Sequence, residues 1–556
     1  MKLQLGSEAP MSLRVGRDEV KTFRGLQHFF NVETWNRSLC FIFLGLIISF
    51  FLFGYWNPYW RNADMDFMMT YQAFLLNDGR PQDFFDHPGH LNILLIDTWF
   101  RLLHSFGLLD VVALSDIPNA SDAVGFERAW TAAVRAGRLL SLLIALSFVG
   151  VFAALIRSLI SDWRIAAFAT FMLAFSTGVM YQARIMRTEL LSGGLEILGL
   201  LLLLIAARSR ASSFRPVIIG IAALLCTLGV VNKVQGIFMV ACWPAVILFF
   251  GSRVENPAWV WRDPKLAIIA IVASAAPILL AVGPAAELFR IGFFERSTSI
   301  SNFPPPPFGV IGLYQTLLAG YVGAAVIVYA RIWRVSLLET VATLEMVALA
   351  VMVGLLFVDI RYHPQNALTV INFLEQMLVW ATNSDPGLGS AGGIFSMRFL
   401  QSVAAGLYEV FAHATFVLHP SSRASMFLQW LVIAGMYVAW KRGHRLLVGQ
   451  VAMLLAAAWF IDLAATFRGA KIDYIIFGDS VIVVAAAWLF GNMLELTAHR
   501  LAFPIGVTLL ATQLVFGQAQ AIRTSFLLRR SPERTCEWVS HYVKLIERFP
   551  YCPPKT

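Results

Sequence analysis

The sequence predicts an all-α polytopic membrane protein with thirteen transmembrane helices. Of its 556 residues, 58% are hydrophobic and only 14% are charged, and the mean hydropathy is +0.68. A soluble fold of this length would need far more polar surface. Apolar stretches of about 18–22 residues, the length that crosses roughly 30 Å of hydrocarbon as a helix, recur along the whole chain. The alternating pattern of a membrane β-barrel is absent from the sequence.

The spans are assigned from apolar runs of membrane length. Their boundaries are least clear around Asn232–Gln235, where a short polar stretch separates two runs. The expected spans are 38–55, 138–157, 165–182, 189–207, 216–232, 235–251, 266–285, 310–330, 338–358, 424–440, 446–466, 474–491 and 501–518.

One further apolar run, 91–107, decides the sidedness of all later loops. Asp97, Arg101 and His104 fall at i, i+4 and i+7, on one face of a helix, which suits a helix lying along the membrane surface. If this run does not cross the membrane, four basic loops lie on the same side of the membrane as the basic N-terminus, as the positive-inside rule requires. These loops are 208–215, 251–265, 331–334 and 441–445.

The chain is therefore expected to have no separate soluble domain and a retained N-terminal span. Residues 1–37 are polar and basic, and no small-residue cleavage site follows the first apolar run, so a cleavable signal peptide is not expected. The expected regions are a cytoplasmic segment 1–37, a membrane module 38–285 with outer loop 56–137, a second membrane module 286–518 with outer loop 359–422, and an outer tail 519–556.

An acidic, histidine-containing stretch, NADMDFMMTYQAFLLNDGRPQDFFDHPGH (62–90), follows the first span. So many ionisable groups must be solvated or enclosed in a protein cavity at the membrane–water boundary. They could bind a metal, a sugar or a proton, or form a solvated loop. Asp64 and Asp66 lie where one helix ends and another begins, so one of them could instead be an N-cap. The other candidates in this stretch are Asp86, His87 and His90.

Basic residues also gather at span ends on the same expected outer side. Lys233 interrupts an apolar run, and such a lysine either extends to the headgroups or meets an anion. The phosphate of a membrane lipid lies at this depth. The other residues of this set are Arg184 and Arg187, with Glu189 entering the next helix, and Arg468 and Lys471 before Tyr474.

Charge and cysteine usage exclude several classes. The net charge of +9 is attributed to topology and lipid contact, because no basic, aromatic-interleaved soluble domain exists to bind nucleic acid. No CxxC or Cys/His zinc spacing appears. Cys536 and Cys552 lie in the tail, where an oxidising exterior permits a disulfide; the alternative is two separate thiols.

The order of these motifs resembles the GT-C class of integral-membrane glycosyltransferases, in particular the protein O-mannosyltransferase and lipid A aminoarabinose transferase type. The resemblance covers the first seven spans and one late motif. Glu189 stands where an Asp is usual, and HPGH replaces a double proline. The matching segments are ADMD (63–66), DHPGHLNILL (86–95), RAGRLLSLLIAL (135–146), ARIMRTELL (183–191), VNKVQGIF (231–238) and RGAKIDYIIFGDS (468–480).

The resemblance implies transfer of a sugar from a polyprenyl-phosphate carrier to a glycan, lipid or protein acceptor at the periplasmic face of the inner membrane. Direct displacement would invert the anomeric carbon. Asp64, or else Asp66, would be the base. Residues two apart face opposite sides of a helix but the same side of an extended segment, so only one acid would point inward if the helix begins before Asp64. Cations would stabilise the leaving phosphate. The implied donor-phosphate residues are Lys233, Arg468, Lys471 and Tyr474, and the implied acceptor, sugar or orienting residues are Asp86, His87, His90, Arg184, Arg187 and Glu189.

No metal or other cofactor is expected, although the Asp/His stretch could hold a divalent cation, as in some relatives. The main rival hypothesis is a secondary transporter or a flippase of lipid-linked glycans. Such a protein should place ionisable groups mid-helix, near the bilayer centre and on broken helices. A polymerase or ligase of surface polysaccharide and a scaffold without chemistry are further alternatives. Most charges here lie at span ends, which favours chemistry at the surface.

Overall fold

The computed structural model confirms the all-α class. All regular structure among the residues that it describes is helical. The described residues are 17–80, 82, 89–119, 121–208, 214–251, 265, 268–269, 271–272, 313–362, 397–415, 423, 425–466, 472–493, 501–527, 536 and 552.

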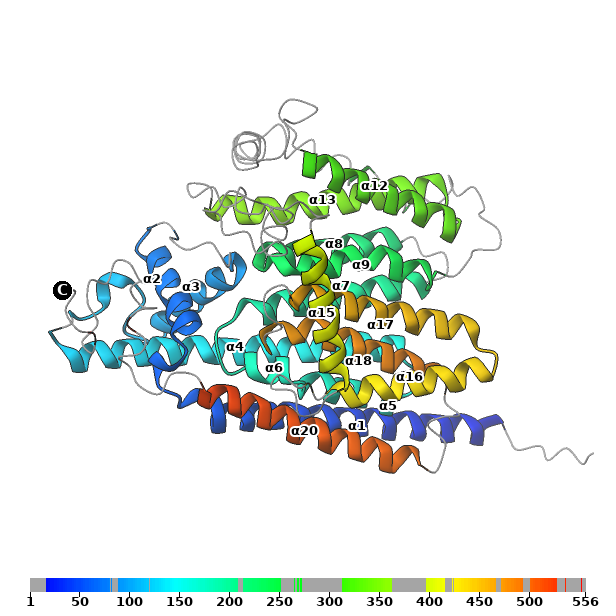
Figure 1. Cartoon of the computed structure of the whole chain (residues 1–556), viewed down its shortest axis with the longest axis horizontal. Helices are drawn as coiled ribbons and strands as arrows, with labels where there is room; N and C mark the ends of the chain where they lie inside the picture. The colour runs from blue at the N-terminus through cyan, green and yellow to red at the C-terminus, as the bar shows by residue number, and fades with distance from the viewer. Residues whose placement is uncertain are drawn as a thin grey trace, which may run out of the picture.

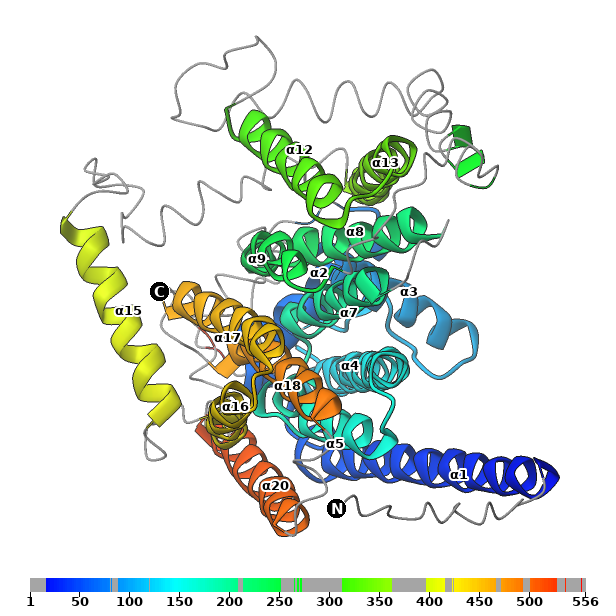
Figure 2. The same cartoon turned by 90° about the vertical axis from the view of Figure 1, so that its right-hand side faces the viewer.

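Most of the long helices lie side by side in one bundle, along the longest axis of the molecule (Figures 1 and 2). Three helices instead run across this direction: α2 (Met68–Asn77), α3 (His90–Ser105) and α15 (Met397–Thr415). The bundle consists of α1 (Arg17–Phe50), α4 (Ala123–Leu159), α5 (Trp163–Ala174), α6 (Thr177–Gln182), α7 (Thr188–Arg208), α8 (Arg215–Asn232), α9 (Ile237–Leu248), α12 (Leu313–Trp333), α13 (Leu337–Tyr362), α16 (Ser425–Lys441), α17 (Arg445–Thr466), α18 (Ile475–Asn492) and α20 (Ala502–Leu527).

Seven helices in the described part of the chain are long and apolar enough to cross a membrane. Several shorter apolar helices accompany them, including Trp163–Ala174 and Pro504–Ala519. The total of thirteen spans stays a prediction, because most of the expected span 266–285 lies outside the described residues. The seven are Glu33–Tyr55, Ala123–Leu159, Thr188–Arg208, Arg215–Asn232, Leu337–Leu355, Arg445–Thr466 and Ile475–Asn492.

Two expected spans have different boundaries. The span expected at 138–157 belongs to α4, which begins at Ala123 because its first turns pack beside α2 and α3 (Figure 1). The span expected at 165–182 is divided into α5 and α6. Ser176 begins the second of these helices by accepting a hydrogen bond from Val179 N–H, as an N-cap serine does.

The run that decides the topology forms α3, which lies across one end of the bundle with α2 rather than along it (Figure 1). The polar face of this helix is only partly exposed. Asp97 is buried and forms an ion pair with Arg101, whose side chain reaches solvent. A carboxylate can be buried at this position because its i+4 neighbour neutralises it.

Helix α18 is the centre of the bundle. Its sequence, IIFGDSVIVVAAAWLFGN, is apolar on nearly every side, which is typical of a helix surrounded by other helices. It packs against α5, α7, α16 and α17, and its residues from Ile475 to Leu489 are buried. A second core joins α2, α3 and the start of α4, where the Trp130 ring makes edge contacts with Phe67 and Phe74.

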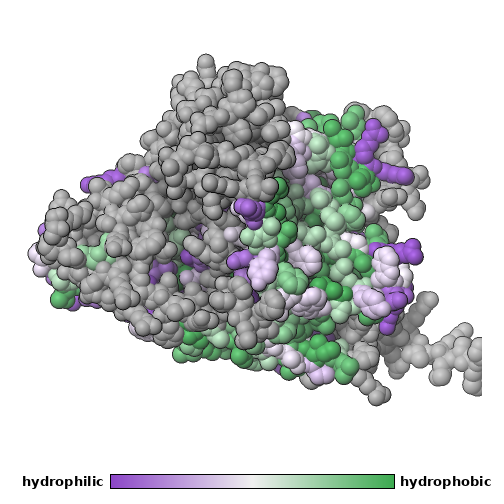
Figure 3. Space-filling model, in the orientation of Figure 1, coloured by the Kyte–Doolittle hydropathy of each residue, from purple (hydrophilic) through white to green (hydrophobic). Residues whose placement is uncertain are grey.

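The outer surface of the bundle is largely apolar, with large exposed side chains such as Leu52, Tyr437 and Val515. Figure 3 shows this apolar surface over the long helices, with hydrophilic residues at its edge, on the side away from α2 and α3. A hydrocarbon environment explains why such a surface is stable.

Candidate functional site

The candidate site begins at a break between two helices of the bundle. α8 ends at Asn232, Lys233 has an extended backbone with φ −149° and ψ 117°, and the short turn η5 (Val234–Gly236) leads into α9. The Asn232 side chain donates to Thr188 O at 2.8 Å and accepts from Asn92 N–H at 3.0 Å. Because α3 and α7 both hold Asn232, the position of the next residue, Lys233, is well defined.

Lys233 is buried and paired. Its Nζ lies 2.9 Å from Glu189 Oε1, and the two side chains are 1% and 0% exposed. The same ammonium lies 5.9 Å from the centroid of the Tyr474 ring. The alternative in which Lys233 extends to the lipid headgroups is therefore wrong. A buried lysine is stable here because a carboxylate and an aromatic face surround it.

The pair is part of a larger group of alternating charges. Arg187 Nε lies 3.2 Å from Glu189 Oε2, and Arg187 Nη2 lies 2.9 Å from Asp473 Oδ2. The turn η9 (Ile472–Tyr474) that carries Asp473 is held by Gln182, whose amide donates to Asp473 O at 2.7 Å. We call Arg187, Glu189, Lys233, Asp473 and Tyr474 the Lys233 cluster. It joins the start of α7, the end of α8 and the start of α18.

Asp66 lies beside this cluster, in the short helical turn η3 (Ala63–Phe67). Its Oδ2 accepts from Arg138 Nε at 2.9 Å and Nη2 at 2.7 Å, and its Oδ1 accepts from Met186 N–H at 2.9 Å. Arg138 also donates to Asn57 O at 2.6 Å. A buried carboxylate held by two nitrogens of one guanidinium is well suited to holding two segments together.

Asp66, an acid of the first loop, is therefore hydrogen-bonded to the backbone of Met186, the residue directly before Arg187. Asp64 lies one position before Met65 in η3, and its side chain lies outside the described part of the structure. Four other predicted site residues, Asp86, His87, Arg468 and Lys471, also lie outside the described residues.

His90 begins α3 at the same end of the bundle. The preceding residue, Gly89, has φ 57° and donates its N–H to Asn232 O at 3.0 Å. This left-handed conformation favours glycine. Burial lowers the pKa of His90 to about 3, so the imidazole is neutral at pH 7. His90 thus directly follows Gly89, which is hydrogen-bonded to Asn232 at the helix break.

Arg184 is not part of the Lys233 cluster. Its guanidinium donates to Ser49 Oγ at 2.7 Å and to Gln518, and it stacks 5.2 Å from the Phe53 ring centroid. Burial lowers the pKa of Arg184 to about 10. Arg184 thus connects α1 and α20, and among the described residues it has no ion pair or hydrogen bond with the Lys233 cluster.

A second buried charge group lies on the other side of η9, and the sequence analysis missed it. Arg423 Nε and Nη2 lie 2.8 and 2.5 Å from Asp479 Oδ1, and Arg423 also pairs with Asp462. Burial opposes the charged form, yet the two carboxylates raise the pKa of Arg423 above its ordinary value. The acids inside the apolar runs 446–466 and 474–491 could have indicated this charge group, because each acid needs a cation nearby.

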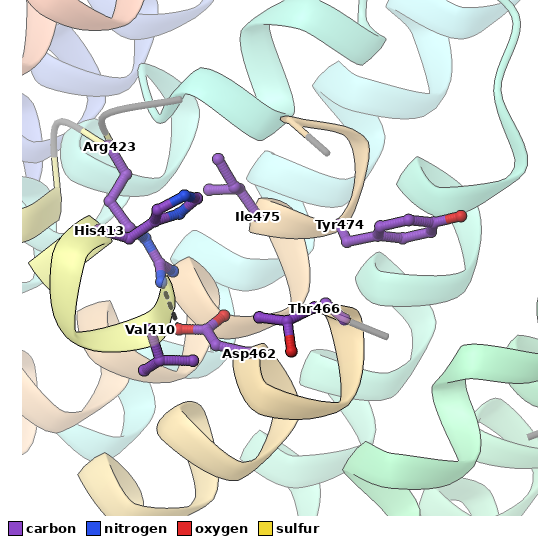
Figure 4. Close-up of a pocket in the computed structure, with 8 residues that line it drawn as sticks. Val410, His413, Arg423, Asp462, Thr466, Tyr474 and Ile475 are labelled. Atoms are coloured by element: carbon purple, nitrogen blue, oxygen red, sulfur yellow. Dashed lines mark hydrogen bonds and ion pairs between the residues drawn. The ribbon is translucent and has the colours of Figure 1, made fainter. Parts of the chain in front are cut away.

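This group lines a small cavity, with a volume of about 20 Å³ for the centres of water-sized molecules, enough for one or two waters. Figure 4 shows the Arg423 guanidinium directed at Asp462, and His413 of α15 also lines the cavity. The Tyr474 ring points away from this cavity, and it is this ring that faces Lys233. One short turn, η9, therefore separates the two charge groups.

Two remaining predictions concern metals and the tail. Among the described residues, no three His, Cys, Asp or Glu side chains are grouped as a metal site. The Asp/His metal alternative depends mainly on Asp86 and His87, outside the described residues. The structure joins Cys536 and Cys552 in a disulfide, with 5.7 Å between their Cα atoms.

Comparisons with known proteins find no matching family model and no matching curated protein. Two similar solved structures are of the Archaeoglobus fulgidus oligosaccharyltransferase. The complex with zinc and sulfate is 14% identical, with a TM-score of 0.44 over 87% of this chain and 53% of that one. The apo form is 14% identical, with a TM-score of 0.45 over 94% of this chain and 61% of that one. The chain thus spans about half to three-fifths of the protein that it matches.

Proposed function

We propose that this protein is a membrane glycosyltransferase that moves a sugar from a polyprenyl-phosphate carrier to a glycan, lipid or protein acceptor at the exterior membrane surface. The observation that carries the proposal is the buried Lys233–Glu189 ion pair at a helix break, beside the turn that holds the first-loop acids.

The distribution of charge supports an exterior location for the Lys233 cluster. The Lys233 cluster lies at the end of the bundle where α2 and α3 lie (Figure 1). Basic residues gather at the helix ends and turns of the opposite end. By the positive-inside rule, that opposite end faces the cytoplasm. These basic residues are Arg157, Arg208, Arg215, Arg331, Arg334, Lys441, Arg442 and Arg445.

The ion pairs suggest how a lipid phosphate would be bound. Lys233 and Arg187 both contact the Glu189 carboxylate, so two cations converge on one anion. A phosphate diester has the same charge and similar oxygen acceptors, and it could take the place of Glu189 between them. Two cations directed at the departing phosphate would stabilise the charge that develops as the sugar leaves. Arg468, Lys471 and Tyr474 complete the proposed donor site.

The hydrogen bonds of Asp66 favour Asp64 as the general base. Asp66 is occupied by Arg138 and by Met186 N–H, whereas a base must present a free lone pair to the acceptor hydroxyl or amine. In this mechanism Asp64 takes the acceptor proton, the acceptor oxygen or nitrogen attacks the anomeric carbon, and the sugar–phosphate bond breaks with inversion. The phosphate leaves on the carrier lipid.

The test is transfer of a radiolabelled sugar from polyprenyl-phosphate carriers to envelope fractions by the purified full-length protein. We expect Lys233→Met to reduce transfer by about 100-fold or more, the usual effect of removing one group that stabilises transition-state charge. Lys441→Met removes an equal charge from an exposed position at the other end and should leave transfer unchanged. Unchanged transfer in Lys233→Met would remove the phosphate-binding role.

One observation favours the rival class of transporters and flippases. Glu196 lies seven residues after Glu189 in α7 and is fully buried, and Gly229 and Gly236 at the helix break pack against it. Its Oε1 accepts from Ser192, and its Oε2 has no hydrogen-bond partner within the described residues. A carboxyl group inside a span and beside a broken helix is the feature expected of proton-coupled transport.

Proteoliposomes distinguish the two classes. A transferase moves label to the acceptor without moving the carrier lipid between leaflets, and Glu196→Gln should leave that transfer intact. A flippase moves the labelled carrier lipid across the bilayer without an acceptor, and Glu196→Gln should stop it. Translocation without transfer would replace the transferase proposal with the rival.

A further inference from the structure

A groove lies at the opposite end of the bundle from the Lys233 cluster, between the ends of α9 and α12. Its volume is about 480 Å³, within the range of small-molecule sites. Two guanidinium groups line it together with three apolar side chains. The lining residues are Leu248, Phe249, Arg331, Ile332 and Arg334.

Arg334 has a backbone conformation that arginine rarely adopts. Its φ is 51°, the only positive φ of a non-glycine residue in the described part of the chain. Val335 N–H donates to Ala330 O at 3.3 Å, the hydrogen bond of a Schellman-type helix end. Glycine is the usual residue at the left-handed position of this motif, because a Cβ atom carries a steric penalty there. The chain thus keeps an arginine where glycine would fit better.

No contact within the described residues compensates for this penalty. Neither Arg331 nor Arg334 has a side-chain hydrogen bond or ion pair there, and both are exposed. The nearby Arg215 shows the contrast, since it is buried and pairs with Glu339 at 2.9 Å. The two groove arginines therefore present to the groove a charge that no described side chain neutralises.

We propose that this groove binds the phosphate headgroup of an anionic phospholipid from the surrounding bilayer. One guanidinium group can bind two phosphate oxygens at once, through two parallel N–H groups. Two guanidinium groups, those of Arg331 and Arg334, lie three residues apart at the end of one span. Basic pockets between spans are typical sites for anionic headgroups. Phe249 and Ile332 offer an apolar surface for the first part of an acyl chain, which a free phosphate ion lacks.

Native mass spectrometry of the full-length protein in a non-ionic detergent tests the proposal, with phosphatidylglycerol, phosphatidylcholine or inorganic phosphate added in separate arms. We expect retained phosphatidylglycerol, and about tenfold less retention in the double variant Arg331→Gln/Arg334→Gln. The matched control, Lys441→Gln/Arg445→Gln, removes two exposed charges from the same end and should retain the lipid as the wild type does. Equal loss in both double variants, equal retention of phosphatidylcholine, or binding of inorganic phosphate alone would each overturn it.

Arg334→Gly provides an independent test, because it separates conformation from binding. Glycine relieves the left-handed strain, so Tm without lipid should rise, while the increase in Tm on adding phosphatidylglycerol should shrink. An unchanged lipid-dependent increase in Tm would contradict the proposal, whatever the Tm without lipid.

Discussion

Lys233 and Glu189 form a 2.9 Å ion pair that water does not reach, although one residue directly follows α8 and the other lies in the first turn of α7. Each side chain would be costly to bury alone. Together with Arg187 and Asp473 they form one buried group of alternating charges, and the proposed chemistry depends on it.

Glu189→Gln should lower the free energy of unfolding by about 3–5 kcal/mol, the usual cost of leaving a buried charge without its partner. Thermal unfolding in detergent measures it. Glu33→Gln is the control, because Glu33 pairs with Arg37 at an exposed position and such pairs contribute less than about 1 kcal/mol.

The same variant also tests the binding hypothesis. If a lipid phosphate takes the place of Glu189, polyprenyl phosphate should raise the Tm of Glu189→Gln more than that of the wild type. A smaller increase in the variant would count against phosphate binding between Lys233 and Arg187.

Asp64→Asn and Asp66→Asn should fail in different ways. Asp66→Asn breaks a fully buried ion pair with Arg138 and should lower Tm strongly. Asp64→Asn should keep the wild-type Tm and lose sugar transfer, because the base is gone while the fold remains. Transfer assays and thermal unfolding on the same preparations separate the two effects. Wild-type transfer by both variants would refute an aspartate base in this turn.

Acid should destabilise the end of the bundle that holds α3. Burial lowers the pKa of His90 to about 3, below its ordinary value, so the unfolded chain binds a proton between about pH 3 and 6.5 that the folded chain does not. Stability therefore falls as the pH drops through 6.5, by about 2 kcal/mol between pH 7 and pH 5.

A titration of unfolding against pH checks this. His90→Gln should flatten the slope between pH 7 and pH 5, whereas His444→Gln, at an exposed position, should not. A wild-type slope in His90→Gln would show that other groups cause the acid sensitivity.

Gly178→Ala should destabilise the protein by about 1–3 kcal/mol, because the packing of α6 against α18 leaves no room for a methyl group. An added Cβ would lie 2.8 Å from the backbone N and Cα of Ile476, atoms that cannot move aside. Gly320→Ala in α12 is the control. Nothing lies within 4 Å of its added Cβ, so the higher helix propensity of alanine should leave stability equal or slightly raised. Thermal unfolding compares the two, and equal Tm values would contradict this packing.

The helices and the ends at which charges gather could be predicted from the sequence, because hydrophobicity and helical period are local properties. Lys233, Arg187, Glu189 and Tyr474 were all predicted as site residues, and the structure brings all four together. Arg184 shows the limit, because the same local pattern placed it with them, whereas its side chain points toward α1 and α20.

Tertiary structure alone decided which charges meet. Arg138 pairs with Asp66 across 72 positions of sequence, and Arg423 pairs with Asp479 across 56. The sequence determined that each of these groups, placed in or beside a span, needs a partner, since an isolated charge is too costly there. It could not say which partner, because that depends on how α4, α17 and α18 rotate and pack, and packing is a property of the whole bundle.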